Sequence, residues 1–439
     1  MEDIEHELCV FLAYDSIFND LLTIMENFIK KLMFSAILTG VCNVLYAQII
    51  YDPPEKYLME FSWASPDTKE YNQNMELYES GPFDGISVKL TKEVGGGNIF
   101  MVENWATVSE NIKENEYKKI KSIGERSTLE HNFLVLYGAS QMDWFSDEDW
   151  KKVETHLRFA ANLAKVGKFK GLLWDPEPYK PGKNPWRMSE QPERAERTYY
   201  DYYLQLRERG AQFIEIIQDE FPGLTILSLR EFSDYQTASP FSQAILPLKD
   251  KKQSRSDLEG AWWALHLPFT LGILDAIHED VTFIDGNEEA YYYTSALEYY
   301  KVRNEIFNDT RALIPLGLHK KFKSNYYLGH AVSVDYIAGN WAGLLNGFPY
   351  RLSGQGAVLT PEQRALWFEH NIYYALKTAD EYVWLYTEDA NWWTGENIPE
   401  GFADALNRAR KKIEEVKPLG YQIEDMLEKA RYKAEKKDN

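Results

Sequence analysis

Two carboxylates stand two residues apart in the stretch from Gly171 to Tyr179, which reads Gly-Leu-Leu-Trp-Asp-Pro-Glu-Pro-Tyr. Its apolar start predicts a short buried strand that ends at Trp174. Because residues i and i+2 of an extended chain point to the same side, Asp175 and Glu177 can face one pocket. The two prolines fix φ and remove backbone donors, so the strand cannot continue through them. A plain turn from strand to loop would use the same residue types.

Paired carboxyl groups of this kind suit the hydrolysis of a glycosidic bond. In that reaction one carboxyl group donates a proton to the leaving oxygen, while the other is ionised and acts as nucleophile or as base for water. Burial, or a like charge close by, separates the pKa values of the two groups. We expect Glu177 to be the general acid. Asp175 would orient the substrate or act as the nucleophile.

The rest of the chain alternates short apolar segments with longer helical patterns. The predicted strands are Tyr57–Trp63, Asp84–Leu90, Asn132–Gly138, Gly171–Trp174, Leu224–Arg230, Val281–Gly286, Tyr326–Val334 and Tyr382–Tyr386. Eight strand-helix repeats predict an α/β fold, a (β/α)8 TIM barrel with extended loops at the C-terminal face of the strands. An open doubly wound sheet is the alternative, but it usually carries a Gly-rich first turn, which this sequence lacks.

In such a barrel the loops after the strands build the active site, so the residues that end each strand become candidates. The expected catalytic partners of Glu177 are, in order, Glu288, Asp285 and Glu388. The expected substrate-binding residues are Trp63, Lys89, Tyr179, Arg230, His330, Trp392 and Trp393. Aromatic rings with a polar edge suit sugar recognition. Lys89 could equally form a salt bridge at the barrel rim, His330 could be a core histidine, and the tryptophan pair could plug the barrel mouth.

Composition excludes several classes of partner. The chain has 439 residues and a formal net charge of −20 at pH 7, which argues against binding nucleic acid or an anionic membrane surface. Aromatic residues make up 15% of the chain, in keeping with a carbohydrate substrate. The sequence has no zinc-type Cys/His spacing, no P-loop and no GxGxxG motif. We therefore expect neither a metal nor a cofactor.

The amino terminus predicts a targeting segment over residues 25–47. Two lysines precede an apolar run of signal-peptide length, and the small residue Ala47 offers a cleavage point. The run is too short for a comfortable membrane span, although an uncleaved anchor is the alternative. The expected location is therefore secreted or periplasmic, with no membrane partner after cleavage.

The same segment sets the expected domain boundaries. Residues 1–24 would be an extension ahead of the true start, 48–420 the barrel domain, and 421–439 a charged helical tail. Cys9 and Cys42 both precede the cleavage point, so cysteine catalysis is excluded.

From about residue 55 to 415 the chain resembles secreted (β/α)8 glycoside hydrolases. The stretch from Asp175 to Tyr179 is similar to the Asp-x-Glu-Tyr ending of the chitinase-type families. That resemblance implies Glu177 as the acid and Asp175 as the residue that orients an acetamido group of the substrate. The earlier aspartates of that motif are missing here, so substrate-assisted cleavage becomes a secondary option. Other barrel families pair a strand-four Asp nucleophile with a strand-six Asp acid, which would assign Asp175 and Asp285.

The combined prediction is a metal-independent glycoside hydrolase that acts on a neutral or weakly charged poly- or oligosaccharide. One alternative is a non-catalytic carbohydrate-binding barrel that keeps Trp63, Trp392 and Trp393 as platforms. A second alternative is a metal-dependent hydrolase that uses Asp175, Glu177, Asp285 and His330, since the acids suit a hard cation.

Overall fold

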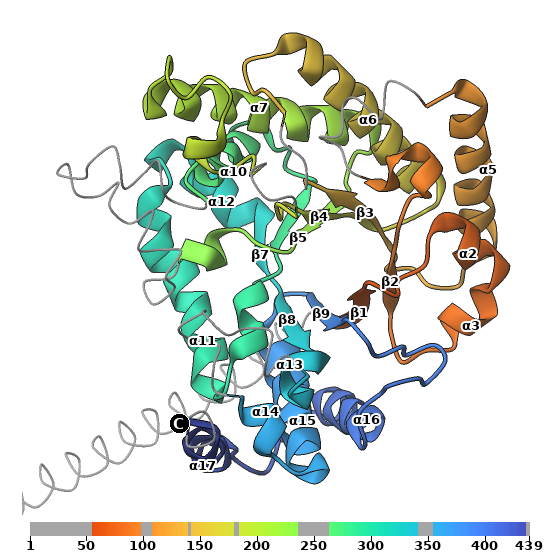
Figure 1. The fold of residues 1–439 in the computed structure, drawn as a ribbon, viewed down its shortest axis with the longest axis vertical. Helices are drawn as coiled ribbons and strands as arrows, with labels where there is room; N and C mark the ends of the chain where they lie inside the picture. Colours follow the sequence, from red (N-terminus) through yellow and green to blue (C-terminus); the bar gives the residue numbers. More distant parts are fainter. Residues whose placement is uncertain are drawn as a thin grey trace, which may run out of the picture. The chain divides into compact units, whose positions relative to one another are not determined.

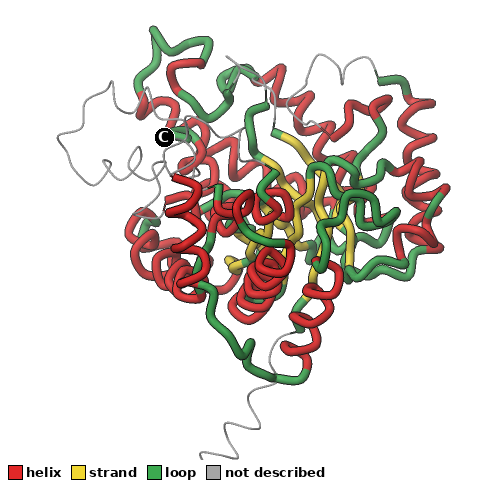
Figure 2. Tube along the Cα trace, turned by 60° about the horizontal axis from the view of Figure 1, so that its bottom comes forward, coloured by secondary structure: helices red, strands yellow, loops and turns green. Residues whose placement is uncertain are grey.

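The computed structural model describes residues 55–97, 108–138, 142–179, 184–235, 263–340 and 354–435. Within these ranges all paired strands run parallel, and helices lie around them (Figures 1 and 2). The strands are β1 Tyr57–Ser62, β2 Gly85–Val88, β3 Phe133–Tyr137, β4 Gly171–Asp175, β5 Thr225–Ser228, β6 Thr282–Asp285, β7 Tyr326–Leu328, β8 His330–Ser333 and β9 Tyr382–Thr387. Each predicted strand is found, with shifts of a few residues at its ends.

The sheet closes into a barrel through the seventh predicted strand, Tyr326–Val334, which is divided into β7 and β8. The strand order is β7-β6-β5-β4-β3-β2-β1-β9-β8, and Gly329 alone separates β7 from β8. β7 pairs with β6, whereas β8 pairs with β9. One continuous piece of chain therefore supplies both ends of the order, and the nine segments occupy eight positions around a ring. The predicted (β/α)8 TIM barrel is confirmed.

Alternation along the strands creates two apolar layers. Met59 and Phe61 belong to the cluster inside the barrel, and so do Leu173 and Leu229. Residues of the other parity, such as Leu58 on β1 and Leu172 on β4, face the surrounding helices. Because side chains alternate with a period of two, this parity decides which residues beyond a strand can reach the barrel mouth.

The helical layer contains α2 Thr68–Gln73, α3 Met75–Glu79, α5 Glu110–Arg126, α6 Asp147–Val166, α7 Tyr199–Glu220, α10 His266–Ala276, α11 Ala296–Asn304, α12 His319–Asn325, α13 Val334–Ala338, α14 Gln355–Val358, α15 Pro361–Thr378, α16 Phe402–Glu414 and α17 Glu424–Glu435. The sequence pattern suggests a helical region from about residue 192, but α7 begins only at Tyr199. Thr198 and Asp201 form a capping box that fixes this start.

The predicted charged tail is a helix with an apolar face. α17 buries Leu427, Ala430 and Ala434, and the side-chain amide of Gln355 donates to the carbonyl oxygen of Leu427 at 3.1 Å. The predicted extension at 1–24 and signal peptide at 25–47 lie outside the described residues. Within the described ranges, every helix is too short or too polar to cross a bilayer.

The packing of α7 on α10 yields a stability prediction. Gly210 lies on α7, and a Cβ there would sit 2.0 Å from the carbonyl oxygen of Phe269. We expect Gly210→Ala to lower the free energy of unfolding by about 2 kcal/mol or more, because the clash outweighs the gain in helix propensity. Urea unfolding measures this change. Gly317→Ala, whose Cβ would meet nothing within 4 Å, should stay within about 0.5 kcal/mol of the unmodified chain. Equal stability of the two variants would contradict the packing argument.

Candidate active site

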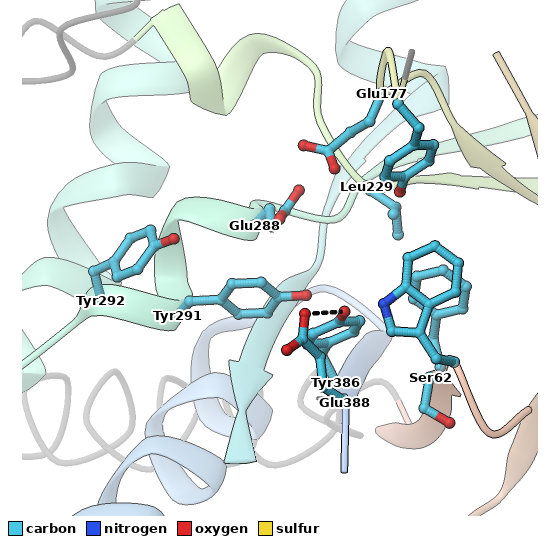
Figure 3. A pocket seen from close by; sticks show the side chains of 11 residues that line it. Ser62, Glu177, Leu229, Glu288, Tyr291, Tyr292, Tyr386 and Glu388 are labelled. Atoms are coloured by element: carbon cyan, nitrogen blue, oxygen red, sulfur yellow. Dashed lines mark hydrogen bonds between the residues drawn. The ribbon is translucent and has the colours of Figure 1, made fainter. Parts of the chain in front are cut away.

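A cavity of about 190 Å³ lies at the carboxyl ends of the strands (Figure 3). Its lining comes from the ends of β1, β4, β5, β6 and β9, as expected for a barrel of this type. The lining residues are Phe61, Ser62, Trp63, Glu177, Tyr179, Leu229, Glu288, Tyr291, Tyr292, Tyr386 and Glu388. The wall therefore combines six aromatic rings with three carboxyl groups.

Glu177 and Glu288 meet at one guanidinium nitrogen. Arg230 Nη1 lies 2.9 Å from Glu177 Oε1 and 3.2 Å from Glu288 Oε2. The same guanidinium bonds Asp234 at 2.8 Å and Glu289 at 3.4 Å. Figure 3 shows the carboxyl groups of Glu177 and Glu288 turned toward each other. The structure thus brings together the first-choice acid and the first-choice partner from the sequence, with Arg230 between them.

Backbone hydrogen bonds continue beyond the strand ends and fix this meeting. The amide of Leu229 donates to the carbonyl of Trp174, and the amide of Glu288 donates to the carbonyl of Leu229. These bonds, at 3.0 and 3.3 Å, tie the chain after β5 to β4 and the chain after β6 to β5. The catalytic candidates are therefore positioned by extensions of the barrel itself.

Asp175 holds the backbone of Glu177 in place. It is fully buried and accepts hydrogen bonds from the Glu177 amide at 2.9 Å and from the Tyr179 hydroxyl at 2.5 Å. Asp175 does not line the cavity, although it shares the parity of Glu177. Its contacts make it a residue that orients the loop and Tyr179.

Burial separates the protonation states of the acids. Burial, and then the neighbouring carboxylate of Glu177, raise the pKa of Asp175 to about 8. Burial raises the pKa of Glu288 well above its usual range, and the charge of Glu177 adds to this effect. Burial therefore favours the protonated form of both groups, the form in which a carboxyl group can act as a general acid.

Two sequence candidates point away from the cavity. Asp285, at the end of β6, accepts from the Ser233 amide and hydroxyl, from Tyr326 and from the Asn287 amide. His330 is buried between Asn287 and Thr378, with ring nitrogens 2.9 Å from each partner. Ile284 and Ala331 occupy the inward positions on these strands, so parity sends Asp285 and His330 outward.

The first and fourth strand ends form one edge of the site. Trp63 lines the cavity and is 54% exposed, and its ring meets Tyr179 edge-on at 5.8 Å. Lys89 lies outside the lining. Its Nζ donates to the carbonyl oxygens of Ser62 and Trp63, each at 2.9 Å, and sits 5.7 Å from the Trp63 ring. Lys89 therefore fixes the loop that carries Trp63.

The tryptophan pair after β9 is part of the core. Trp392 and Trp393 are buried, and both rings pack edge-on against Phe83, at 5.7 and 5.5 Å. Neither lines the cavity, so the structure places them as packing residues and not as sugar platforms. Glu388, from the same segment, does line the cavity.

The sequence reasoning missed most of the aromatic wall. Phe61 and Tyr386 lie on the inward parity of β1 and β9, a signal that counting alternate residues would have found. Tyr291 and Tyr292 belong to the short 3-10 turn Glu288–Tyr292, which directly follows β6. A run of three tyrosines after a strand end was the available signal for that pair.

No three His, Cys, Asp or Glu side chains in the described ranges are arranged to hold a metal ion. The acids around the cavity instead surround the guanidinium of Arg230.

Comparisons with known proteins find distant structural likenesses to this chain. No family model matches the sequence, and no curated protein matches it. One similar solved structure is the crystal structure of GH5_18 from Streptomyces cattleya in complex with GlcNAc. It is 11% identical, covers 84% of this chain and 82% of that chain, and has a TM-score of 0.45. Another is a glucosidase from Croceicoccus marinus, at 8% identity, 82% and 69% coverage, and a TM-score of 0.40. These values are too low to assign an activity, so function must be inferred from the site itself.

A further buried acid lies just behind the rim. Glu60 of β1 is 1% exposed, and the Ser65 hydroxyl donates to its carboxyl group at 3.0 Å. Burial raises the pKa of Glu60 to about 7, although bonds from Ser62 and Ser65 oppose the shift. The folded chain therefore binds this proton more tightly than the unfolded chain does. Stability from this group is complete below the unfolded pKa and is lost as pH rises toward 7.

Glu60→Gln should remove that loss. Between pH 5 and pH 8 we expect the variant to gain stability relative to the unmodified chain, approaching about 3 kcal/mol, because its amide needs no proton. Urea unfolding at both pH values measures the difference. Glu76→Gln, at an exposed position on α3, serves as the control and should show no such trend. A constant difference between the Glu60→Gln variant and the unmodified chain at the two pH values would refute the buried-proton argument.

Proposed function

We propose that this chain is a glycoside hydrolase that cleaves O-glycosidic bonds in a poly- or oligosaccharide. The proposal rests on the pair Glu177 and Glu288. Their carboxyl groups face each other in the cavity, and both accept a hydrogen bond from Nη1 of Arg230. The aromatic wall supplies surfaces on which sugar rings stack. The signal peptide predicted at 25–47 would make the enzyme secreted or periplasmic.

Glu288 is the better proton donor of the pair. Its side chain is 16% exposed, against 26% for Glu177, and it lies farther from the guanidinium. The more buried acid, which lies farther from the cation, favours its protonated form. This assignment reverses the expectation from the sequence, in which Glu177 was the acid. Glu177 then serves as the nucleophile.

The spacing of the two groups favours double displacement. The oxygens that contact Arg230 can be no farther apart than the sum of their distances to Nη1, 2.9 and 3.2 Å. For this pair of oxygens the limit is below the separation of the carboxyl groups in inverting enzymes, roughly 6.5–9.5 Å, which leaves room for a water molecule. The geometry therefore supports attack by Glu177 on the anomeric carbon, with no intervening water.

In the first step Glu288 gives its proton to the glycosidic oxygen as the bond from that oxygen to the anomeric carbon breaks. Glu177 bonds to the same carbon and forms a glycosyl ester. In the second step the ionised Glu288 takes a proton from water, and the resulting hydroxide displaces Glu177. Arg230 contacts both groups, so it stabilises whichever one is charged.

Paired variants test these roles. Glu288→Gln should lower kcat/KM by about 100-fold to 10,000-fold on glycosides with poor leaving groups. It should retain far more activity on dinitrophenyl glycosides, because such a leaving group needs no proton. Glu177→Gln should lose activity on both substrate types, since no glycosyl ester can form. Glu396→Gln, at an exposed position of the segment after β9, is the matched control and should behave as the unmodified chain.

These variants also separate the competing functions. Full activity of both cavity variants would sink the assignment of the pair. Sugar binding without turnover by the unmodified chain would instead identify a non-catalytic carbohydrate-binding barrel. Activity lost with EDTA and restored by Mg²⁺ or Ca²⁺ would identify the metal-dependent alternative.

Stereochemistry gives an independent test of the spacing. We expect the first-formed product to keep the anomeric configuration of the substrate, because two successive inversions restore it. Proton NMR of the anomeric signal during the first minutes of hydrolysis distinguishes the anomers before mutarotation. Inverted product would show that a water molecule enters between the carboxyl groups.

A further inference from the structure

The cavity wall carries three carboxyl groups, and none of its side chains from the described residues is a lysine, arginine or histidine. An ionised carboxylate only accepts hydrogen bonds, whereas the tyrosine and serine hydroxyls of the lining can also donate. The Tyr179 hydroxyl proton is already donated to Asp175, at 2.5 Å, and that of Tyr386 to Glu388, at 3.3 Å. The acidic side chains of this wall therefore favour a ligand group that brings positive charge.

Glu388 is fixed at a place that the catalytic pair does not occupy. Its backbone amide donates to Asp335 at 2.7 Å, and its carboxyl group accepts from Tyr386. Figure 3 shows the Glu388 carboxyl group and the Tyr291 hydroxyl together, on the side of the cavity away from Glu177. A sugar ring whose anomeric carbon lies at Glu177 would turn another of its substituents toward Glu388.

Aromatic rings lie next to the same place. The rings of Tyr291 and Tyr386 are stacked at 5.6 Å, and Phe61 lies 6.1 Å from Tyr386. The face of an aromatic ring attracts a cation, most strongly where water is displaced. Rings and a carboxyl group together favour a positively charged substituent over a carboxylate or an acyl group.

We infer that the sugar unit held in the cavity carries a protonated amine beside Glu388, as an amino sugar does. An ammonium group brings one positive charge and three donors to the carboxyl groups of this wall. Neither an N-acetyl group nor a hydroxyl group brings a charge. The inference rests on the proposed function for the placement of the ring, but its ligand chemistry rests on the wall.

Isothermal titration calorimetry tests the inference without turnover. The probes are D-glucosamine and D-galactosamine, each compared with its parent sugar and its N-acetyl form at a pH where the amine is protonated. We expect the dissociation constant of at least one amine to be lower than those of both its counterparts by about tenfold, which corresponds to about 1.4 kcal/mol. Glu388→Gln should abolish the preference. Asp389→Asn removes the same charge from the adjacent exposed residue, which lies outside the lining, and should keep the preference.

The inference is overturned if a parent or N-acetyl sugar binds as tightly as its amine, if neither amine binds, or if the preference survives Glu388→Gln. Thermal unfolding confirms that the variant is folded. Hydrolysis of neutral glycosides without amine preference would refute this inference alone. An amine preference without hydrolysis of any glycoside would refute the proposed function alone.

Discussion

The guanidinium of Arg230 makes the acid-rich centre of this barrel possible. It is 6% exposed and contacts Glu177, Asp234, Glu288 and Glu289. Burying a carboxylate without a counter-charge costs several kcal/mol. One cation faces four carboxyl groups here, and the crowding of like charges disfavours the ionised form of the more buried ones. The charge imbalance around Arg230 thus favours the protonated form of Glu288, the form that a general acid needs.

The barrel delivers these groups through register. Trp174 is aligned with Ser228 and Ser228 with Asp285, so the chain leaves β4, β5 and β6 at one level. After β6 the chain must turn at once to bring Glu288 back over Leu229. Asn287 makes that turn with φ of 46°, a left-handed conformation that asparagine tolerates better than most residues. Its backbone amide donates a hydrogen bond to the side chain of Asp285. Asp285 therefore contributes to the site by shaping the turn, although it lies outside the cavity.

Much of this arrangement could be predicted from the sequence, because strand position and parity are local properties. Apolar runs gave all eight strand positions, and Glu177 and Glu288 follow directly from the ends of two of them. Strict parity would also have turned Asp285 and His330 outward and brought in Phe61 and Tyr386. The burial of Trp392 and Trp393 could not be predicted, because it depends on Phe83, which is more than 300 residues away in the chain. The protonation states were equally out of reach, since they depend on how three separate loops surround one arginine.

Under the proposed mechanism, the shared guanidinium would also let the charge move with little rearrangement. Glu288 would become an anion when it gives up its proton, and at that moment Glu177 would lose its negative charge to the new glycosyl ester. Nη1 is already 3.2 Å from Glu288, so the counter-charge needs only a small adjustment and no new solvation. A lysine could not take this place on equal terms, because its compact ammonium lacks the planar fork that reaches several carboxyl groups at once. Arginine at this position would thus serve the proposed chemistry as well as folding. The same contacts that stabilise the acids in the buried state would stabilise the charge as it moves from one to the other.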